Sequence, residues 1–270
     1  MASIINFDIT SIKNLPNSII NVAVDAQSDN YIPSSRGESI EFNNVINPDF
    51  EIASPIELKN AVMRGCATSL YTVGATKKIT LKTGQIITLR LANNTTDMYE
   101  YADKTGTTGF VLEFVDMYSK KYYMNYESRD KNGWSASYMR NTVLPIIFEQ
   151  LPDDWQQVIS EVKIKGSNGY SLGNNILIES NDKLFLPAER ETSPIKKFCS
   201  QIEWDALSTW QYYSKFSYSN RVKQLNGVDT AWWLRSPCEA EQSFCIIYSD
   251  GDWFHIRPGI EQGVAPAFCI

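Results

Sequence analysis

Residues 231–237 read Ala-Trp-Trp-Leu-Arg-Ser-Pro, "AWWLRSP", and lie within the last forty residues of a 270-residue chain that ends in "GVAPAFCI". Two adjacent tryptophans bring a large apolar surface to one point, and such side chains dominate the energetics of cores and of interfaces. The segment is therefore either the core of the final domain or the edge of a binding surface. We expect Trp232, Trp233 and Leu234 to anchor the terminal sheet, with Arg235 pairing or capping nearby.

The composition of the whole chain is that of an ordinary folded protein, with 43% hydrophobic and 21% charged residues. The chain is rich in Tyr (14), Phe (12) and Trp (7), and Gly, Asn, Ser and Thr are plentiful between them. Aromatic residues favour strands and the small polar residues favour turns, so we expect a β-rich fold. The length suits one large domain or two unequal domains.

The charge balance excludes several classes of partner. The net charge is −6, and no block of five or more basic residues occurs, so we expect neither nucleic acid nor an anionic membrane as a partner. No apolar run of 18 residues is present, which argues against membrane insertion. The first residues lack a basic stretch followed by a long apolar run, so we expect no signal peptide.

The cysteines and the histidine argue against a metal or a cofactor. The five cysteines are odd in number and contain no C-x-x-C pair, and we expect reduced thiols packed as small apolar groups. His255 is the one histidine of the chain, which leaves no His-rich metal site and makes zinc improbable.

The chain divides into an N-terminal segment and a main domain. Residues 1–50 carry short apolar clusters separated by Asn, Ser, Asp and Pro, and we expect an extended attachment segment there. The alternative is a subdomain folded onto its own chain. Residues 51–270 form the main domain.

Within the main domain, Ser54-Pro55-Ile56-Glu57 predicts a capped helix over 55–64, and Thr83-Gly84 predicts a hairpin turn. The further predicted elements are strands within 110–126, a helix at 139–147, a helix after Pro152, a strand at 162–165, a strand–turn–strand over 174–187, a helix over 203–216 and strands to the end. This order predicts an α+β fold, with segregated helices and a mostly antiparallel sheet.

Residues 243–258, "SFCIIYSDGDWFHIRP", predict a hairpin with Asp250-Gly251 as a two-residue type I′ turn. That turn would pair Tyr248 with Trp253 and Cys245 with Ile256. Because side chains alternate between faces, the register then separates two sets of residues. The core set is Cys245, Ile247, Phe254 and Ile256, and the other set is Tyr248, Trp253, His255 and Arg257, with Phe244 and Ile246.

The second set suits ligand contact, because Tyr, Trp and Arg give large contact areas at low entropic cost. The predicted ligand-binding residues are Tyr248, Asp250, Asp252, Trp253, His255, Arg257 and, in the following loop, Glu261. The alternative is that another segment of the chain covers this face. Asp250 and Asp252 offer oxygen ligands to Ca²⁺, but carboxylates beside a hairpin turn are more typical of turn chemistry, and we expect no metal.

Several motifs occur in a fixed order along residues 52–270: "YTVGATKKITLKTGQIITL" from Tyr71, "NGWSASYMR" from Asn132, "DKLFL" from Asp182, Asn220-Arg221, "WWLRSP" and "GVAPAF". Together they resemble the domain of unknown function common in phages and prophages of gut bacteria. Ala265 stands where many relatives have Arg. The resemblance implies a C-type-lectin-like C-terminal part, with ligand residues on the hairpin above and in the loop 259–262.

The same resemblance implies a phage virion structural protein, such as a fibre, tail or head decoration, made in the host cytoplasm. Its lectin-like domain would bind a host-surface glycan or protein, and residues 1–50 would attach to other virion proteins. A homo-oligomer is expected by analogy with fibre proteins. No catalytic constellation is evident, so we expect no enzyme. The alternatives are a purely architectural capsid or tail subunit and an oxidase of the formylglycine-generating type that uses Cys238 and Cys245.

Overall fold

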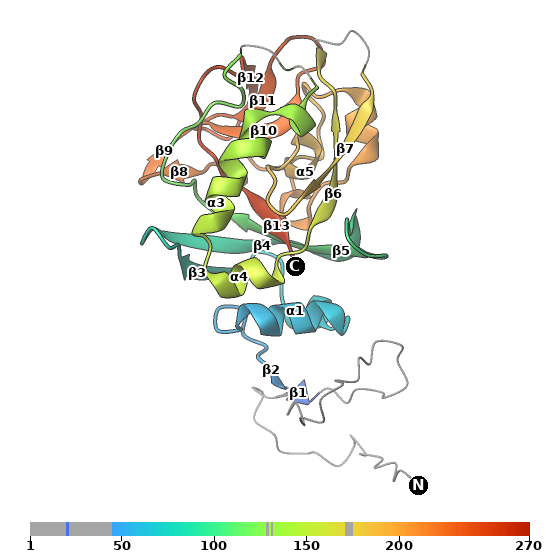
Figure 1. Ribbon diagram of the computed structural model, residues 1–270, viewed down its shortest axis with the longest axis vertical. Helices are drawn as coiled ribbons and strands as arrows, with labels where there is room; N and C mark the ends of the chain where they lie inside the picture. The colour runs from blue at the N-terminus through green and yellow to red at the C-terminus, as the bar shows by residue number, and fades with distance from the viewer. Residues whose placement is uncertain (1–19, 22–44, 128–129, 131, 171–174) are drawn as a thin grey trace.

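The structure is a computed structural model that describes residues 20–21, 45–127, 130, 132–170 and 175–270 (Figure 1). The predicted attachment segment, residues 1–50, therefore lies mostly outside the described residues. The described chain is a mixed α/β fold with mostly antiparallel strand pairs and few helices.

A four-stranded antiparallel sheet forms the base of the molecule. Its strand order is β13-β5-β4-β3, and its members are β3 (Thr76–Thr80), β4 (Ile86–Glu100), β5 (Thr107–Phe114) and β13 (Ala267–Cys269). Figure 1 shows α1 (Pro55–Met63) and α4 (Asp153–Val158) below this sheet. Since β13 pairs with β5 through Phe268↔Leu112, the end of the chain closes the core rather than trailing from it.

A second, smaller sheet lies above the base. It contains β10 (Trp232–Pro237), β11 (Phe244–Ile247) and β12 (Trp253–Ile256) in that order, and β6 (Val162–Ser167) pairs with β7 (Leu177–Asp182) beside it (Figure 1). The remaining elements are β1 (Ile20–Asn21), β2 (Val45–Ile46), α2 (Ala67–Leu70), η2 (Trp134–Ala136), η3 (Met139–Val143), α3 (Leu144–Gln150), α5 (Glu189–Thr192), α6 (Gln201–Ala206), η5 (Gln211–Tyr213), η6 (Ser219–Arg221), β8 (Gln224–Leu225) and β9 (Val228–Asp229).

Local sequence signals correctly predicted several elements. Helix α1 begins with a capping box, in which the Glu57 carboxylate accepts from the Ser54 backbone N–H at 2.7 Å. Strands β3 and β4 pair around the predicted Gly84 turn, where the glycine φ is +85°. Helix α4 follows Pro152, also as predicted, and it buries Trp155 and Val158. Helical structure also begins at Met139, although its first turn is a π-helix.

Three sequence predictions were wrong because tertiary contacts override local preference. The helix predicted over 203–216 ends at Ala206. Beyond it the extended Trp210 is buried, with its backbone N–H donating to the Glu191 carbonyl and its indole to the Tyr99 hydroxyl. The second strand of 174–187 and the strand near Tyr122 are reduced to isolated bridges, Phe185↔Ala267 and Tyr122↔Gln262.

The "WWLRSP" segment forms β10, and Trp232, Trp233 and Leu234 are fully buried. The Trp232 indole donates to the Arg221 carbonyl at 2.9 Å, and the Trp233 indole donates to the Tyr122 carbonyl at 2.8 Å. The Trp232 indole thus ties β10 to η6, and the Trp233 indole ties it to Tyr122, 111 residues away. Both bonds satisfy an indole N–H inside the core. The predicted anchoring role of these residues is confirmed.

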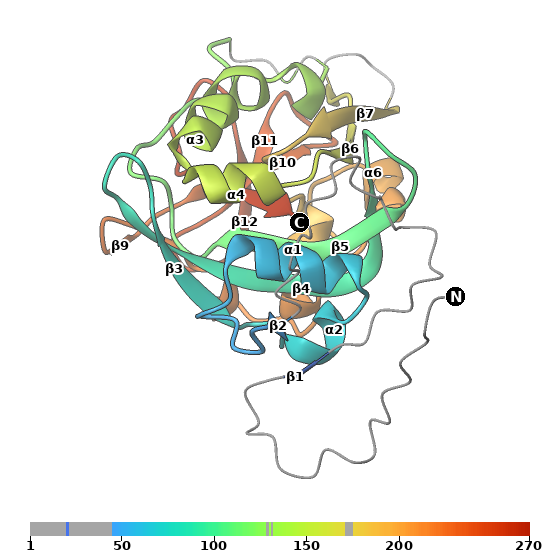
Figure 2. The same ribbon diagram turned by 60° about the horizontal axis from the view of Figure 1, so that its bottom comes forward.

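The body of the protein begins before residue 51. Ile46 and Phe50 are buried, and the Tyr71 hydroxyl donates to the Asn47 carbonyl at 2.8 Å. Figure 2 shows α1, α2 and β2 together in front of the lower face of the base sheet. No helix among the described residues has the length and apolar character needed to cross a membrane.

Candidate functional site

The β11–β12 hairpin forms, but its register differs by one residue from the predicted one. The observed pairs are Phe244↔Ile256, Cys245↔His255, Ile246↔Phe254 and Ile247↔Trp253. A type I′ turn needs positive φ at both central residues, and here Gly251 has φ +85° whereas Asp250 does not adopt positive φ. The loop therefore contains three residues, 249–251, and is closed by the Tyr248 N–H donating to the Asp252 carbonyl at 2.8 Å.

This one-residue shift exchanges the two faces of β12. Trp253, predicted to face a ligand, is only 4% exposed and is packed in the core, whereas Phe254, predicted to be core, is 40% exposed. The predicted outward positions of Phe244 and Ile246 are also wrong, because both are buried. A close backbone approach fixes the loop in this register, since a Cβ on Gly251 would lie 2.0 Å from the Tyr218 carbonyl oxygen.

The corrected hairpin presents a stack of three rings. Tyr248, 38% exposed, stacks on Phe254 with ring centroids 5.0 Å apart and planes at 18°. The His255 ring continues the stack, 5.2 Å from Phe254 at 15°. An exposed, pre-stacked set of rings loses little conformational entropy on contact with a partner, which suits a binding surface.

The two aspartates of the turn bond to their own backbone. The Asp250 carboxylate accepts from the Asp252 N–H at 3.0 Å, and the Asp252 carboxylate accepts from the Trp253 N–H at 2.8 Å. Both are exposed, as are Arg257 and Glu261 in the loop that follows. Within the described ranges, no group of three or more His, Cys, Asp and Glu side chains suits a metal ion.

On the other side of β12, the hairpin contacts a cluster that the sequence analysis missed. We define the Arg221 cluster as Arg221, Trp253, Phe216 and Tyr218. The guanidinium carbon lies 3.6 Å from the ring centroid of Trp253, 4.9 Å from that of Phe216 and 5.3 Å from that of Tyr218. The alternation Phe216-Ser-Tyr218 shortly before Asn220-Arg221 is the sequence signal that precedes this cluster.

The guanidinium of Arg221 is buried without a hydrogen-bond acceptor. The side chain is 1% exposed, and among the described residues none accepts from its Nε, Nη1 or Nη2. The indole Nε1 of Trp253 likewise has no acceptor in the described chain. Burial lowers the pKa of Arg221 to about 10, and Asp252 is the main charge that opposes this shift. The group therefore remains a cation at neutral pH.

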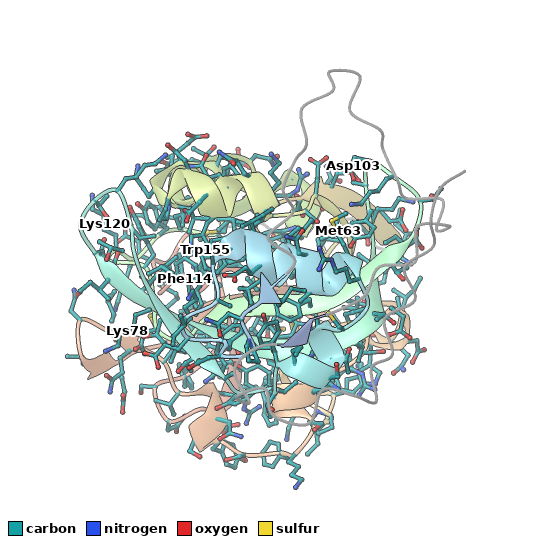
Figure 3. All side chains as sticks on the ribbon, turned by 90° about the horizontal axis from the view of Figure 1, so that it is seen from below. Met63, Lys78, Asp103, Phe114, Lys120 and Trp155 are labelled. Atoms are coloured by element: carbon teal, nitrogen blue, oxygen red, sulfur yellow. The ribbon has the colours of Figure 1, made fainter. Side chains whose placement is uncertain are left out.

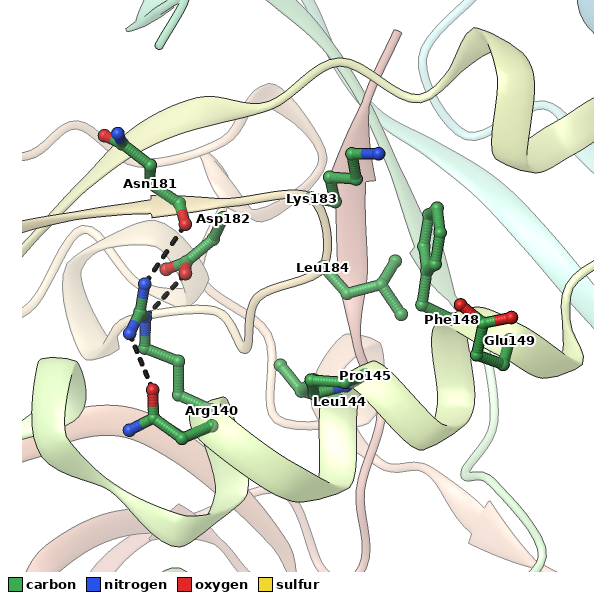
Figure 4. A pocket seen from close by; sticks show the side chains of 10 residues that line it. Arg140, Leu144, Pro145, Phe148, Glu149, Asn181, Asp182, Lys183 and Leu184 are labelled. Carbon is green, nitrogen blue, oxygen red and sulfur yellow. Dashed lines mark hydrogen bonds and ion pairs between the residues drawn. The ribbon is translucent and has the colours of Figure 1, made fainter.

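A separate hollow of about 380 Å³ lies between α3 and the end of β7 (Figure 4). Its arginine, Arg140, is engaged by the chain itself: Nε lies 2.6 Å from the Asp182 carboxylate, which also accepts from the Trp134 indole at 2.8 Å. A Cβ on Gly133 would lie 2.0 Å from the Ser167 carbonyl oxygen. The "NGW" and "MR" residues of this motif therefore build the frame around the hollow.

The cysteines are free thiols, as expected, and four of the five are buried: Cys199, Cys238, Cys245 and Cys269. Cys199 faces Cys238 across an antiparallel bridge, and the Cys245 thiol lies 3.4 Å from the Glu189 carboxylate. Burial raises the pKa of the Cys199 and Cys245 thiols above its ordinary value, with Glu189 adding to the shift. Because the thiolate is the reactive form, these thiols suit packing better than redox chemistry.

Comparison with known proteins identifies a family but no characterised relative. No curated protein and no solved structure matches the chain. The family described as "Domain of unknown function (DUF6273)" matches residues 109–270, which include most of β5, the whole upper sheet, the Arg221 cluster and β13. The chain therefore belongs to the DUF6273 family of domains of unknown function.

Proposed function

We propose that this protein is a phage virion structural protein whose upper sheet recognises a host-surface glycan or protein. The observation that carries the proposal is the ring stack on the β11–β12 hairpin, in which Tyr248 and Phe254 are exposed and His255 is partly buried behind them. Rings held in this way are typical anchors of recognition surfaces, and their faces also stack on sugars. The assignment to a virion is supported by the resemblance of the ordered sequence motifs to those of phage and prophage proteins.

The arrangement of the chain supports recognition at one end and attachment at the other. Figure 1 shows β11 and β12 in the upper part of the molecule and β2 with α1 at the opposite end. An N-terminal segment that joins other virion proteins would leave the hairpin directed outward. We propose a C-type-lectin-like arrangement, in which the base sheet holds the C-terminal strand and the upper sheet carries the ligand residues. We also propose that the protein is a homo-oligomer in the virion.

A purely architectural role is the second candidate, and a specific observation favours it. Three apolar side chains on and just before α1 are more than half exposed: Ile52 (66%), Ile56 (56%) and Met63 (68%). Figure 3 shows Met63 on the lower side of the molecule, with α1 across the middle of this view. An exposed apolar stripe of this kind suits packing against a neighbouring subunit. The oxidase alternative would use Cys238 and Cys245, and it is disfavoured because burial raises the pKa of the Cys245 thiol.

A glycan array probed with the purified protein separates recognition from architecture. We expect binding that Phe254→Ala and Tyr248→Ala abolish and that Tyr126→Ala, which truncates another exposed ring (67% exposed), leaves intact. Silence across the array, with the protein still present in purified virions, would favour the architectural role. Absence of the protein from purified virions would overturn both.

A further inference from the structure

The described chain concentrates its unsatisfied polar atoms at one place. Among all the described residues, seven buried side-chain nitrogen and oxygen atoms have no hydrogen-bond partner. Four of the seven belong to Arg221 and Trp253, whose side chains are in contact. Native proteins pair nearly all buried polar groups, so such a concentration calls for an explanation. The four atoms are all donors, and one of the two side chains is charged.

The other buried cationic side chains of the described residues are each paired with a buried carboxylate of the same chain. Arg90 lies 2.8 Å and Lys223 lies 3.0 Å from the carboxylate of Glu113, and Arg235 lies 2.5 Å from that of Glu191. No carboxylate of the described residues lies within ion-pair distance of Arg221. An unpaired buried charge costs several kcal/mol. Its acceptor is therefore expected from outside the described chain.

We infer that Arg221 and the Trp253 indole bind the oxyanion, a carboxylate or a sulfate ester, of an acidic saccharide. This inference rests on the proposed function and narrows its ligand class. A guanidinium presents a rigid fork of N–H donors that matches two oxygens of one oxyanion. The Trp253 ring covers the face of the guanidinium, which leaves the edge with its N–H groups for the acceptor.

The surroundings define how an oxyanion reaches the site. Phe216 and Tyr218, which are 40% and 46% exposed, form the outer wall of the site. Phe216 lies between η5 and η6, and Tyr218 is the N-cap residue of η6. The four donors are sealed from solvent, so the inferred binding requires these rings to move. Lys197, whose ammonium lies 5.5 Å from the Trp253 ring centroid, adds a second positive charge, whereas Asp252 opposes an incoming anion.

Titration calorimetry with glucuronate tests the inference on the purified full chain, with glucose as the uncharged probe. We expect glucuronate to bind the wild type and the binding to weaken at least about ten-fold in Arg221→Met, as expected for a charged hydrogen bond. Lys120→Met, which removes an exposed cation that belongs neither to the hairpin nor to the Arg221 cluster, serves as the control. Equal binding by wild type and Arg221→Met, or no binding by either, would overturn the inference.

Thermal unfolding without glucuronate separates a ligand site from a structural stack. If Arg221 awaits an oxyanion, Arg221→Met unfolds at the same or a higher temperature than the wild type, because an unpaired buried charge is replaced by an apolar side chain. A markedly lower unfolding temperature would assign Arg221 to the core and overturn the inference. Binding to uncharged sugars alone would support the proposed function and contradict the inferred oxyanion site. Glucuronate binding by a protein that is absent from virions would support the oxyanion site and contradict the proposed function.

Discussion

Arg235 and Arg221 are two buried arginines of the same upper layer, yet the chain treats their charges differently. The Arg235 guanidinium forms a bidentate pair with the Glu191 carboxylate, at 2.5 Å for both contacts, and donates to the Leu186 carbonyl. The Arg221 guanidinium has rings on its faces and no acceptor among the described residues. The first arrangement is complete within the fold, and the second is complete only when a ligand is added.

The largest expected effect on stability comes from breaking the Arg235–Glu191 ion pair. Replacing Arg235 with Met leaves the buried Glu191 carboxylate without its partner, and we expect a loss of about 3–5 kcal/mol in the free energy of unfolding. Urea denaturation measures the loss. Arg221→Met is the matched variant, and it should show no loss in the free energy of unfolding. If both variants lost the same amount, the distinction between the two arginines would fail.

The next effect concerns the glycine that holds the hairpin against the Arg221 cluster. Gly251 and Gly84 both have φ +85°, but a Cβ on Gly251 would lie 2.0 Å from the Tyr218 carbonyl, whereas a Cβ on Gly84 would meet nothing within 4 Å. Gly84→Ala carries only the cost of positive φ, about 1 kcal/mol, whereas Gly251→Ala adds a backbone clash and should lose about 2–3 kcal/mol. Comparable losses in urea denaturation would show that the Tyr218 contact does not hold the loop.

A smaller effect appears in the pH dependence of stability. Burial lowers the pKa of Lys59, whose ammonium donates to the Ser160 hydroxyl at 2.6 Å, to about 8 from an ordinary 10.5. Between these two values the unfolded chain binds more protons than the folded one, so the free energy of unfolding rises with pH.

We expect Lys59 to contribute about 1–2 kcal/mol to this rise between pH 7 and pH 10. Urea denaturation over this range should show a smaller rise for Lys59→Met than for the wild type, and Lys78→Met is the control on an exposed strand position. An identical rise in Lys59→Met would contradict the assigned cause.

The features that depend on local signals were predicted correctly from the sequence. The Ser54–Glu57 capping box and the Gly84 turn are encoded within a few residues, and the burial of Trp232 and Trp233 follows from their size. The hairpin register was wrong because Asp250-Gly251 permits two loop lengths, and the contact between Gly251 and Tyr218, 33 residues earlier in the sequence, favours the longer one. The Arg221 cluster was missed for the same reason, since its rings meet only in the folded chain.

The smallest expected effect concerns Asp252 and the affinity of the Arg221 site for glucuronate. Asp252 is exposed and its charge is the main one that raises the pKa of Arg221, so its carboxylate already offsets part of the positive charge that an oxyanion would meet. Asp252→Asn should therefore strengthen glucuronate binding about three-fold while changing the free energy of unfolding by less than about 0.5 kcal/mol.

Asp250→Asn removes a carboxylate of the same turn that is not among the charges raising the Arg221 pKa, and it should leave the affinity nearly unchanged. Calorimetry at low and at high salt checks the cause, because the charge of an exposed carboxylate is screened by salt and the gain of Asp252→Asn should shrink as salt is added. A gain of equal size in both variants would mean that general repulsion by an acidic protein, rather than the neighbourhood of Arg221, opposes the anion.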